Sequence, residues 1–201
     1  ALPIYDIRFA YQPFRFSDLH QSSVPLPSED DMIVRAIQIP PEGLDRNAYI
    51  FYQYGDIALC AYILIGDNGF NYLTAKVPRP FADVLQLNDE QIMDIALENT
   101  ESLYPAVFYS TPGDALYSRN GISLENIERD DFYPFGLFLS TDHQTNGATA
   151  LFYHGILKRI TDLLQEDFYV VFISFSIAHI VPKSQGKKKN LKKSLKKVNA
   201  I

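Results

Sequence analysis

Two stretches rich in strand-forming residues flank a short turn between residues 49 and 77, and this pair most limits the folds open to the chain. The first runs from Tyr49 to Ile65, the second runs from Phe70 to Val77, and Gly66-Asp67-Asn68-Gly69 lies between them. Tight β-turns favour glycine, asparagine and aspartate, so the segment predicts an antiparallel hairpin. Pro78 and Pro80 end the second strand because proline lacks the backbone N–H that a sheet uses.

Two further segments carry helix signals. Asn88 is a favourable N-cap residue and Gln91 stands three residues later, which predicts a helix over about 89–99. A second helix is predicted over about 148–165, after Asn146-Gly147. In each helix, four residues at helical spacing share one face. They are Ile92, Ile95, Ala96 and Asn99 in the first helix, and Leu151, Leu157, Ile160 and Leu164 in the second.

Four other stretches resemble strands in composition. Residues 32–39 fit either a strand or the end of a helix, and residues 103–110 fit a short strand broken by a proline. Residues 132–140 are rich in aromatic side chains, and residues 168–181 are predicted as one central strand because Val, Ile and Phe favour strands. Strands and helices do not alternate regularly, so we expect an α+β fold with a mostly antiparallel or mixed sheet.

Composition divides the chain into three parts. A chain of 201 residues with 47% hydrophobic content can bury one substantial core, which favours a single domain over residues 32–182. Residues 1–31 lack clear periodicity and are predicted as an irregular arm, and residues 183–201 form a basic tail. Of the 18 basic residues, eight are lysines of this tail, which leaves ten against 24 acidic residues and a net charge of −14 for the rest.

The basic tail has two interpretations. As a helix it would align Leu191, Leu195 and Val198 on one side, which is typical of segments that bind an anionic macromolecule or an acidic protein. Alternatively it is a solubilising extension, because a short isolated helix is marginal in water. In the first case the binding residues are Lys187, Lys188, Lys189, Lys192, Lys193, Lys196 and Lys197.

Cysteine and histidine usage favours neither a metal site nor a cofactor site. Cys60 is the single cysteine and lies in the apolar run 57–65, so we expect it in the core. One cysteine cannot form an internal disulfide, and neither a leader nor a transmembrane segment is recognisable, which favours a cytoplasmic location. The four histidines lack paired ligand spacing, so we expect no metal and no cofactor.

A nucleophilic site is the catalytic arrangement that the residue types allow. It would combine Ser174 or Ser176 with His179 or His154 and with an acid such as Asp142. No Gly-x-Ser-x-Gly turn surrounds either serine, and on a single strand both would face away from His179. Packing within a sheet is therefore the competing interpretation for the two serines.

Six segments, in order along the chain, carry a family resemblance. They are 87–100, 103–105, 139–141, 146–153, 155–157 and 167–171. Together they resemble DUF5688, a bacterial domain family of unknown function found mainly in Firmicutes and their mobile elements, and the match lies mainly within residues 87–182. Asn99, Thr100, Asn146 and Gly147 belong to the matching motif, and the simplest role for the two asparagines is to cap helices.

The chain departs from this family near its C-terminal end. The family follows its last helix with Pro-Ser-Ser-Ile-His-Glu, where this chain has Phe172-Ile173-Ser174-Phe175-Ser176-Ile177. Ser176 and Ile177 replace the histidine and the glutamate, so a polar site at this place in the family would be lost here. The resemblance therefore implies a fold and no activity.

Two functional interpretations remain. The first is a non-enzymatic binding or regulatory module of a bacterial cytoplasmic protein, because no catalytic set converges in the sequence. The second is a small hydrolase-like enzyme whose site lies near the C-terminal strand and uses the Ser174, Ser176, His154 and Asp142 set. The first is favoured.

Overall fold

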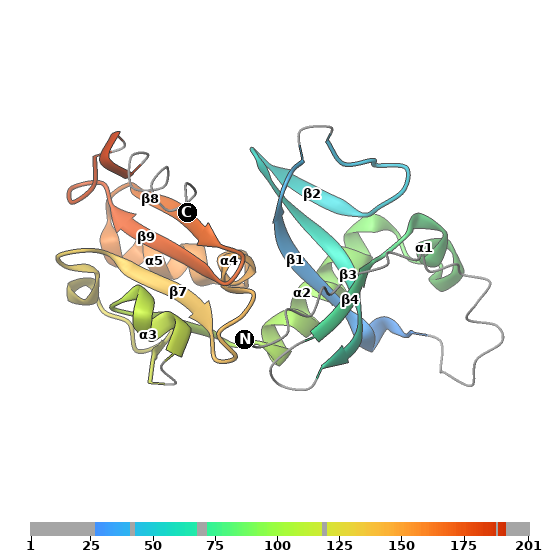
Figure 1. Ribbon diagram of the computed structural model, residues 1–201, viewed down its shortest axis with the longest axis horizontal. Helices are drawn as coiled ribbons and strands as arrows, with labels where there is room; N and C mark the ends of the chain where they lie inside the picture. Colours follow the sequence, from blue (N-terminus) through green and yellow to red (C-terminus); the bar gives the residue numbers. More distant parts are fainter. Residues whose placement is uncertain (1–26, 41–42, 68–71, 118–119, 188, 192–201) are drawn as a thin grey trace, which may run out of the picture.

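Two antiparallel sheets lie side by side, each with helices packed against it (Figure 1). The computed structural model describes residues 27–40, 43–67, 72–117, 120–187 and 189–191. Strands β1 to β4 form the first sheet, and strands β5 to β9 form the second. The predicted α+β fold with antiparallel pairing is confirmed, although its strands are divided between two sheets.

The central strand of the first sheet is β3 (Ile57–Asp67). β1 (Met32–Gln38) lies along one edge of β3, and β2 (Phe51–Tyr54) and β4 (Tyr72–Lys76) follow each other along the other edge. β3 and β4 form the hairpin that the turn residues predicted. The ambiguous segment 32–39 is a strand.

One predicted strand of this sheet is in fact two. The stretch 49–65 was expected to be continuous, but a turn at Gly55 and Asp56 separates β2 from β3. Gly55 has a φ of 65°, a conformation that glycine adopts without steric cost. The chain therefore reverses within an apolar run that has no other break.

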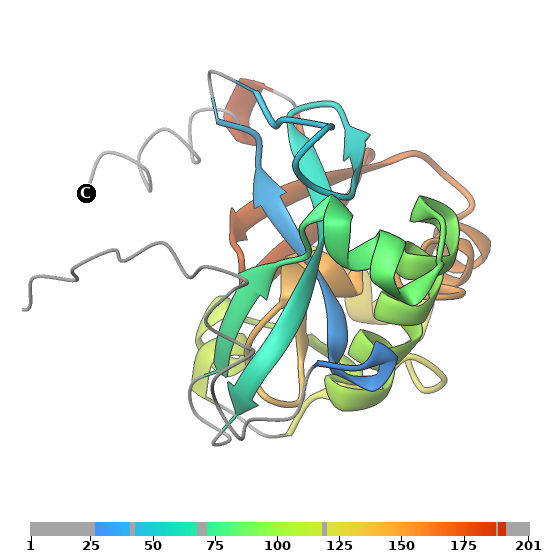
Figure 2. The same ribbon diagram turned by 90° about the vertical axis from the view of Figure 1, so that its right-hand side faces the viewer.

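Helices α1 (Arg79–Leu85) and α2 (Asp89–Leu103) cover one face of the first sheet; Figure 2 shows them in green beside the blue and cyan strands. The predicted capping box begins α2: the Asn88 side chain accepts from the Gln91 N–H at 2.9 Å, and the Gln91 side chain accepts from the Asn88 N–H at 3.0 Å. α2 ends at residue 103 rather than 99, just before Pro105, which cannot continue a helix.

The second sheet has α3 (Pro112–Tyr117) on one face and α5 (Ile156–Leu164) on the other. Ala115 of α3 packs with Tyr109 and Phe138, whereas Ile160 of α5 packs in the cluster that contains Phe108. The strand order is β6 (Ile122–Ser123), β5 (Ala106–Tyr109), β7 (Leu137–Thr141), β9 (Ile177–Pro182) and β8 (Phe168–Ser174).

The helix predicted over 148–165 is also two elements. A short α4 (Gly147–Ala150) is followed by turns, and α5 begins only after Gly155, whose φ is 78°. Because of this break, the buried face of α5 is shifted from the predicted stripe. Ile156 is buried, whereas Leu157 is 43% exposed.

The run 168–181 is a hairpin rather than one central strand. The chain turns at Phe175 and Ser176, so β8 pairs with β9 and lies at the edge of its sheet. The strand predicted over 132–140 begins later, at residue 137, because η3 (Arg129–Phe132) and a cis Tyr133–Pro134 bond precede it.

The two ends of the chain are described in part. Most of the predicted arm lies outside the described residues, and residues 29–31 form the short helix η2 (Glu29–Asp31) ahead of β1. Of the tail, residues 183–187 and 189–191 are described. Within the described part of the chain, no helix has the length and apolar character needed to cross a bilayer.

Candidate functional site

Polar side chains of α2 cover part of the free edge of β1. Alternate residues of an edge strand direct their backbone groups away from the sheet. The Asn99 amide donates to the Met32 carbonyl at 3.0 Å, and the Thr100 hydroxyl oxygen accepts from the Val34 N–H at 2.8 Å. Thr100 is fully buried and in turn donates to the Ala96 carbonyl of its own helix.

Side chains of α4 and of the residue before it cover the rest of this edge. The Asn146 amide donates to the Val34 carbonyl at 3.2 Å, and the Thr149 hydroxyl oxygen accepts from the Ala36 N–H at 2.7 Å. Thr149 also donates to the Asn146 side chain at 3.2 Å. Four side chains therefore take the place of a neighbouring strand, and we call them the β1 ladder: Asn99, Thr100, Asn146 and Thr149.

The β1 ladder corrects the capping role expected for the two asparagines. Asn99 lies inside α2, four residues before its end, and Asn146 precedes α4 without a side-chain capping bond. Thr149 was not singled out from the sequence, although it lies three residues after Asn146 in a segment that resembles the family. A buried N–H or C=O without a partner costs free energy, so these side chains hold α2 and α4 against β1.

Gly147 is required by a close approach of three backbones. A Cβ at this position would lie 2.1 Å from the Ser176 carbonyl oxygen and 2.6 Å from the Ser140 Cα. The Ser140 hydroxyl donates to the same Ser176 carbonyl at 2.8 Å. Gly147 therefore lets α4 meet β7 and the β8–β9 turn, which is a packing role.

The four catalytic candidates occupy separate hydrogen-bonding environments. Ser174 ends β8 and Ser176 lies in the β8–β9 turn, where the Ser176 N–H donates to the Ser174 hydroxyl oxygen at 3.1 Å. His154 contacts Glu101 at 2.9 Å, and Asp142 lies 3.9 Å from His143. In the part of the chain that the structure describes, no hydrogen bond joins His154 or Asp142 to either serine. The argument that both serines face away from His179 assumed a single strand, and this assumption was wrong. Ser174 ends β8, Ser176 lies in the turn, and His179 is on β9.

His179 and Cys60 are held in their neutral forms by burial. Desolvation lowers the pKa of His179, whose Nε2 lies 2.7 Å from the Phe135 carbonyl and whose ring stacks on Phe138 at 4.1 Å. Burial raises the pKa of the Cys60 thiol from 9.0 to about 11. Cys60 is the core residue that its apolar surroundings predicted. Among the described residues, no group of three His, Cys, Asp or Glu side chains is arranged to hold a metal ion.

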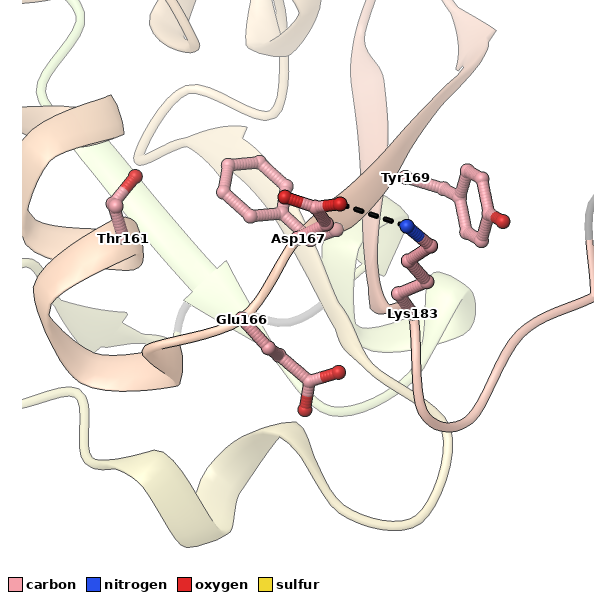
Figure 3. Close-up of a pocket in the computed structure, with 6 residues that line it drawn as sticks. Thr161, Glu166, Asp167, Tyr169 and Lys183 are labelled. Atoms are coloured by element: carbon pink, nitrogen blue, oxygen red, sulfur yellow. Dashed lines mark hydrogen bonds and ion pairs between the residues drawn. The ribbon is translucent and has the colours of Figure 1, made fainter.

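The first residues of the basic tail form polar contacts with Glu166 and Asp167, beside a pocket at the surface (Figure 3). Lys183 pairs with Asp167 at 2.8 Å, and Glu166 accepts from both the N–H and the hydroxyl of Ser184 at 2.8 Å. Thr161 and Tyr169 also line the pocket. Two of the predicted tail residues, Lys187 and Lys189, are exposed. The remaining ones, Lys188, Lys192, Lys193, Lys196 and Lys197, lie outside the described residues.

Aromatic side chains lie beside exposed carboxylates on the helix-covered side of the first sheet. Tyr52 and Tyr54 pair with Leu59 and Ile57 of β3, so they project to the side on which α2 packs. They are 36% and 50% exposed. The Tyr54 ring lies 5.0 Å from the ring of Phe152, which follows α4.

Glu90 and Asp94 complete this region from α2. They are four residues apart and exposed, so they share one face of the helix. Partial burial and the negative charges of Glu90 and Asp94 raise the pKa of Tyr52, which reflects their proximity to its hydroxyl. We call this region the α2–β2 surface: Tyr52, Tyr54, Phe152, Glu90 and Asp94.

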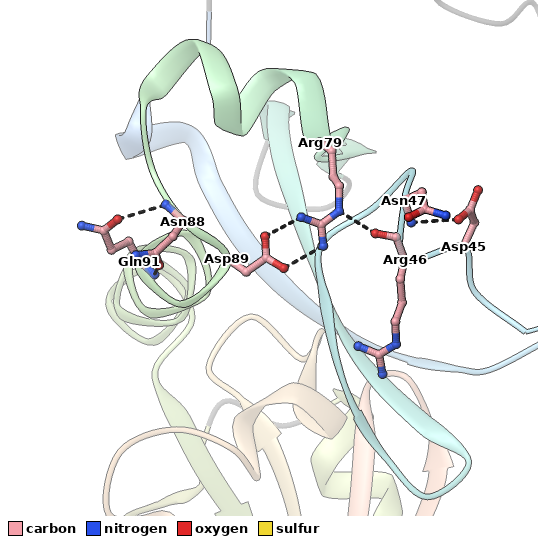
Figure 4. Close-up of polar contacts among 7 residues, drawn as sticks. All are labelled: Asp45, Arg46, Asn47, Arg79, Asn88, Asp89 and Gln91. Atoms are coloured by element: carbon pink, nitrogen blue, oxygen red, sulfur yellow. Dashed lines mark hydrogen bonds and ion pairs between the residues drawn. The ribbon is translucent and has the colours of Figure 1, made fainter.

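Neighbouring charges at the start of α2 are already neutralised. Arg79 makes two hydrogen bonds with Asp89, at 2.7 and 2.8 Å, and also donates to the Arg46 carbonyl (Figure 4). Asp89 therefore has a cationic partner, whereas the structure gives Glu90 and Asp94 no ion pair with a described residue. The negative charge of the α2–β2 surface comes from these two carboxylates.

Comparison with protein-family models gives one match, to a family of unknown function (DUF5688), over residues 46–201. This span is more than half of the chain. The chain belongs to the DUF5688 family. No curated protein and no solved structure matches it.

The DUF5688 match extends beyond the predicted span of 87–182 at both ends. It begins before β2 and includes the whole α2–β2 surface, the four members of the β1 ladder and the basic tail. β1 itself precedes the match, although the side chains that cover its edge lie within it. The positions that depart from the family motif, Ser176 and Ile177, form the end of the β8–β9 turn and the start of β9.

Proposed function

We propose that this domain is a non-enzymatic protein-binding module that recognises a lysine- or arginine-rich segment of its partner through the α2–β2 surface. The observation that supports the proposal is a pair of exposed aromatic rings, Tyr52 and Tyr54, on the face of the sheet that α2 covers, with Tyr52 near the carboxylates of Glu90 and Asp94. Aromatic faces attract cations, and carboxylates pair with lysine and arginine. Such a surface therefore suits a basic segment.

The charge of the chain agrees with this proposal. Residues 1–182 carry 24 acidic against ten basic residues, so long-range attraction would speed the approach of a basic partner. The four residues of the β1 ladder are used to hold β1, so their chemistry serves the scaffold. We place the module in the bacterial cytoplasm, which is compatible with its single, buried cysteine.

A direct test is binding of a fluorescein-labelled octalysine or octaarginine peptide to the full chain, followed by fluorescence anisotropy. We expect saturable binding that weakens as salt is added, because exposed charges are screened. Glu90→Gln/Asp94→Asn should weaken binding about tenfold, since each exposed charge pair contributes up to about 1 kcal/mol. Tyr54→Ala should weaken it by loss of cation–π contact.

Matched controls separate this surface from general charge effects. Glu125→Gln/Asp130→Asn removes the same charge from exposed positions near η3, and Tyr117→Ala removes a tyrosine that is 85% exposed on α3. Both controls should bind the peptides as the unmodified chain does. Equal weakening by the control pair and by the α2 pair would contradict the proposal, because the peptide would then respond only to net charge.

A further inference from the structure

The outer edge of β8 differs from the edge of β1, which side chains cover, and from the two-residue edge strand β6. β8 is the last strand of the second sheet and pairs only with β9 among the described strands. Residues 168–173 are all half-buried, whichever face of the sheet their side chains occupy, and Ser174 is exposed. In β7 every residue is buried. β8 is therefore partly exposed to solvent along its whole length.

Among the described residues, the free edge of β1, unlike that of β8, is covered by side chains of the same chain. On β1, the β1 ladder binds the outward backbone groups of Met32, Val34 and Ala36. At the other end of the second sheet, the edge strand β6 has two residues, too few for extended pairing. A long, apolar and uncovered edge strand is a template for pairing with another strand.

We propose that β8 pairs antiparallel with β8 of a second copy of this chain, joining two second sheets across a twofold axis. The sequence of β8, Phe-Tyr-Val-Val-Phe-Ile-Ser, contains no charge, so its self-pairing sets no like charges opposite each other. Pairing centred on Val171 places Phe168 opposite Ser174 of the partner. In this register Asp167 of one copy faces Phe175, which lies in the uncharged β8–β9 turn of the other copy.

The same arrangement explains why association would stop at two copies. Each chain has one β8, and pairing uses its free edge completely. The opposite edge of the sheet ends in the two-residue β6, which cannot continue the assembly. A twofold contact of this kind is closed and does not lead to a fibre. This inference is independent of the proposed binding of a basic partner, which concerns the first sheet.

Charge substitutions at Val171 test the pairing in the full chain by sedimentation velocity over a wide range of protein concentration. The unmodified chain should show a monomer–dimer equilibrium. Val171→Lys and Val171→Glu should each weaken self-association about tenfold or more, because like charges then face each other across the axis. An equimolar mixture of the two variants should regain the dimer, since lysine then faces glutamate. Tyr117→Lys, on α3, should leave the equilibrium unchanged.

Amide hydrogen exchange gives a second, independent measurement. The amides of residues 168–174 should become more protected as the concentration of the unmodified chain rises. A monomer at every concentration would overturn the proposal, as would a dimer that survives both Val171 variants or a mixture that fails to regain it. If the chain is monomeric and its β8 amides are protected at every concentration, another part of the same chain covers β8. That result would also overturn the proposal.

Discussion

The hydroxyl oxygen of Thr100 accepts the backbone N–H of Val34 at 2.8 Å and so joins the middle of α2 to the edge of a strand 66 residues earlier. Thr100 is fully buried, and its own hydroxyl hydrogen goes to Ala96. With Asn99, Asn146 and Thr149 it replaces the neighbouring strand that β1 lacks. Three DUF5688 motif residues, Asn99, Thr100 and Asn146, thereby acquire a physical role in holding α2 and α4 against β1.

Thr100→Val should lower the free energy of unfolding by about 1–3 kcal/mol, because valine keeps the shape of threonine but leaves the Val34 N–H buried without an acceptor. Chemical denaturation measured by circular dichroism gives the value. Thr161→Val is the matched control, since Thr161 is exposed and bonds only within its own helix. A Thr100 variant as stable as this control would show that the buried N–H finds another partner.

Gly147→Ala should also destabilise the fold, by about 1–3 kcal/mol, because the added methyl group meets the Ser176 carbonyl at 2.1 Å and the fixed backbone of β7. Thermal unfolding provides the comparison. Gly113→Ala lies in α3, where the nearest atom to the new methyl group is 3.8 Å away, and should not be destabilised. Equal melting temperatures for the two variants would argue against a close approach at α4.

Cys60 should make the free energy of unfolding fall as the pH rises in the alkaline range. Its thiol has a higher pKa in the folded chain, about 11, than the 9.0 of an exposed thiol, so the folded state holds the proton more tightly. This contribution, roughly 2–3 kcal/mol, is complete below pH 9 and is lost as the pH rises towards 11. Denaturation of the unmodified chain and of Cys60→Ala from pH 8 to 11 should show a steeper decline for the former. Parallel declines would mean that the thiol is not desolvated.

His179 should make the free energy of unfolding fall as the pH drops below neutral. Burial lowers its pKa below 6.5, so the unfolded chain takes up a proton more readily than the folded chain, and stability falls as the pH drops from 6.5 through the folded pKa. NMR titration should give His179 a pKa below 6.5. His179→Gln should reduce the loss of stability between neutral and mildly acidic pH, whereas His154→Gln should not.

The sequence indicated local elements well where the signal lies within a few residues. The Asn88–Gln91 capping box and the antiparallel pairing of β3 with β4 are confirmed because their chemistry is completed by neighbours in the chain. The errors share one cause. Each apolar run that looked like one element is interrupted, at Gly55, at Gly155 and at the Phe175–Ser176 turn. The sequence does not reveal these breaks, because one long element and two short elements that pack together need apolar residues equally.

By itself the sequence determined the α+β class, the burial of Cys60, the start of α2 and membership of a family with ordered segments. Only the tertiary structure decided what Asn99, Thr100, Asn146 and Thr149 do, because their partners lie on β1, more than 60 residues away. It also decided that β8 is an edge strand and that Tyr52 lies near Glu90 and Asp94. Those facts depend on strand order and on which faces meet, and long-range packing of the apolar faces sets both.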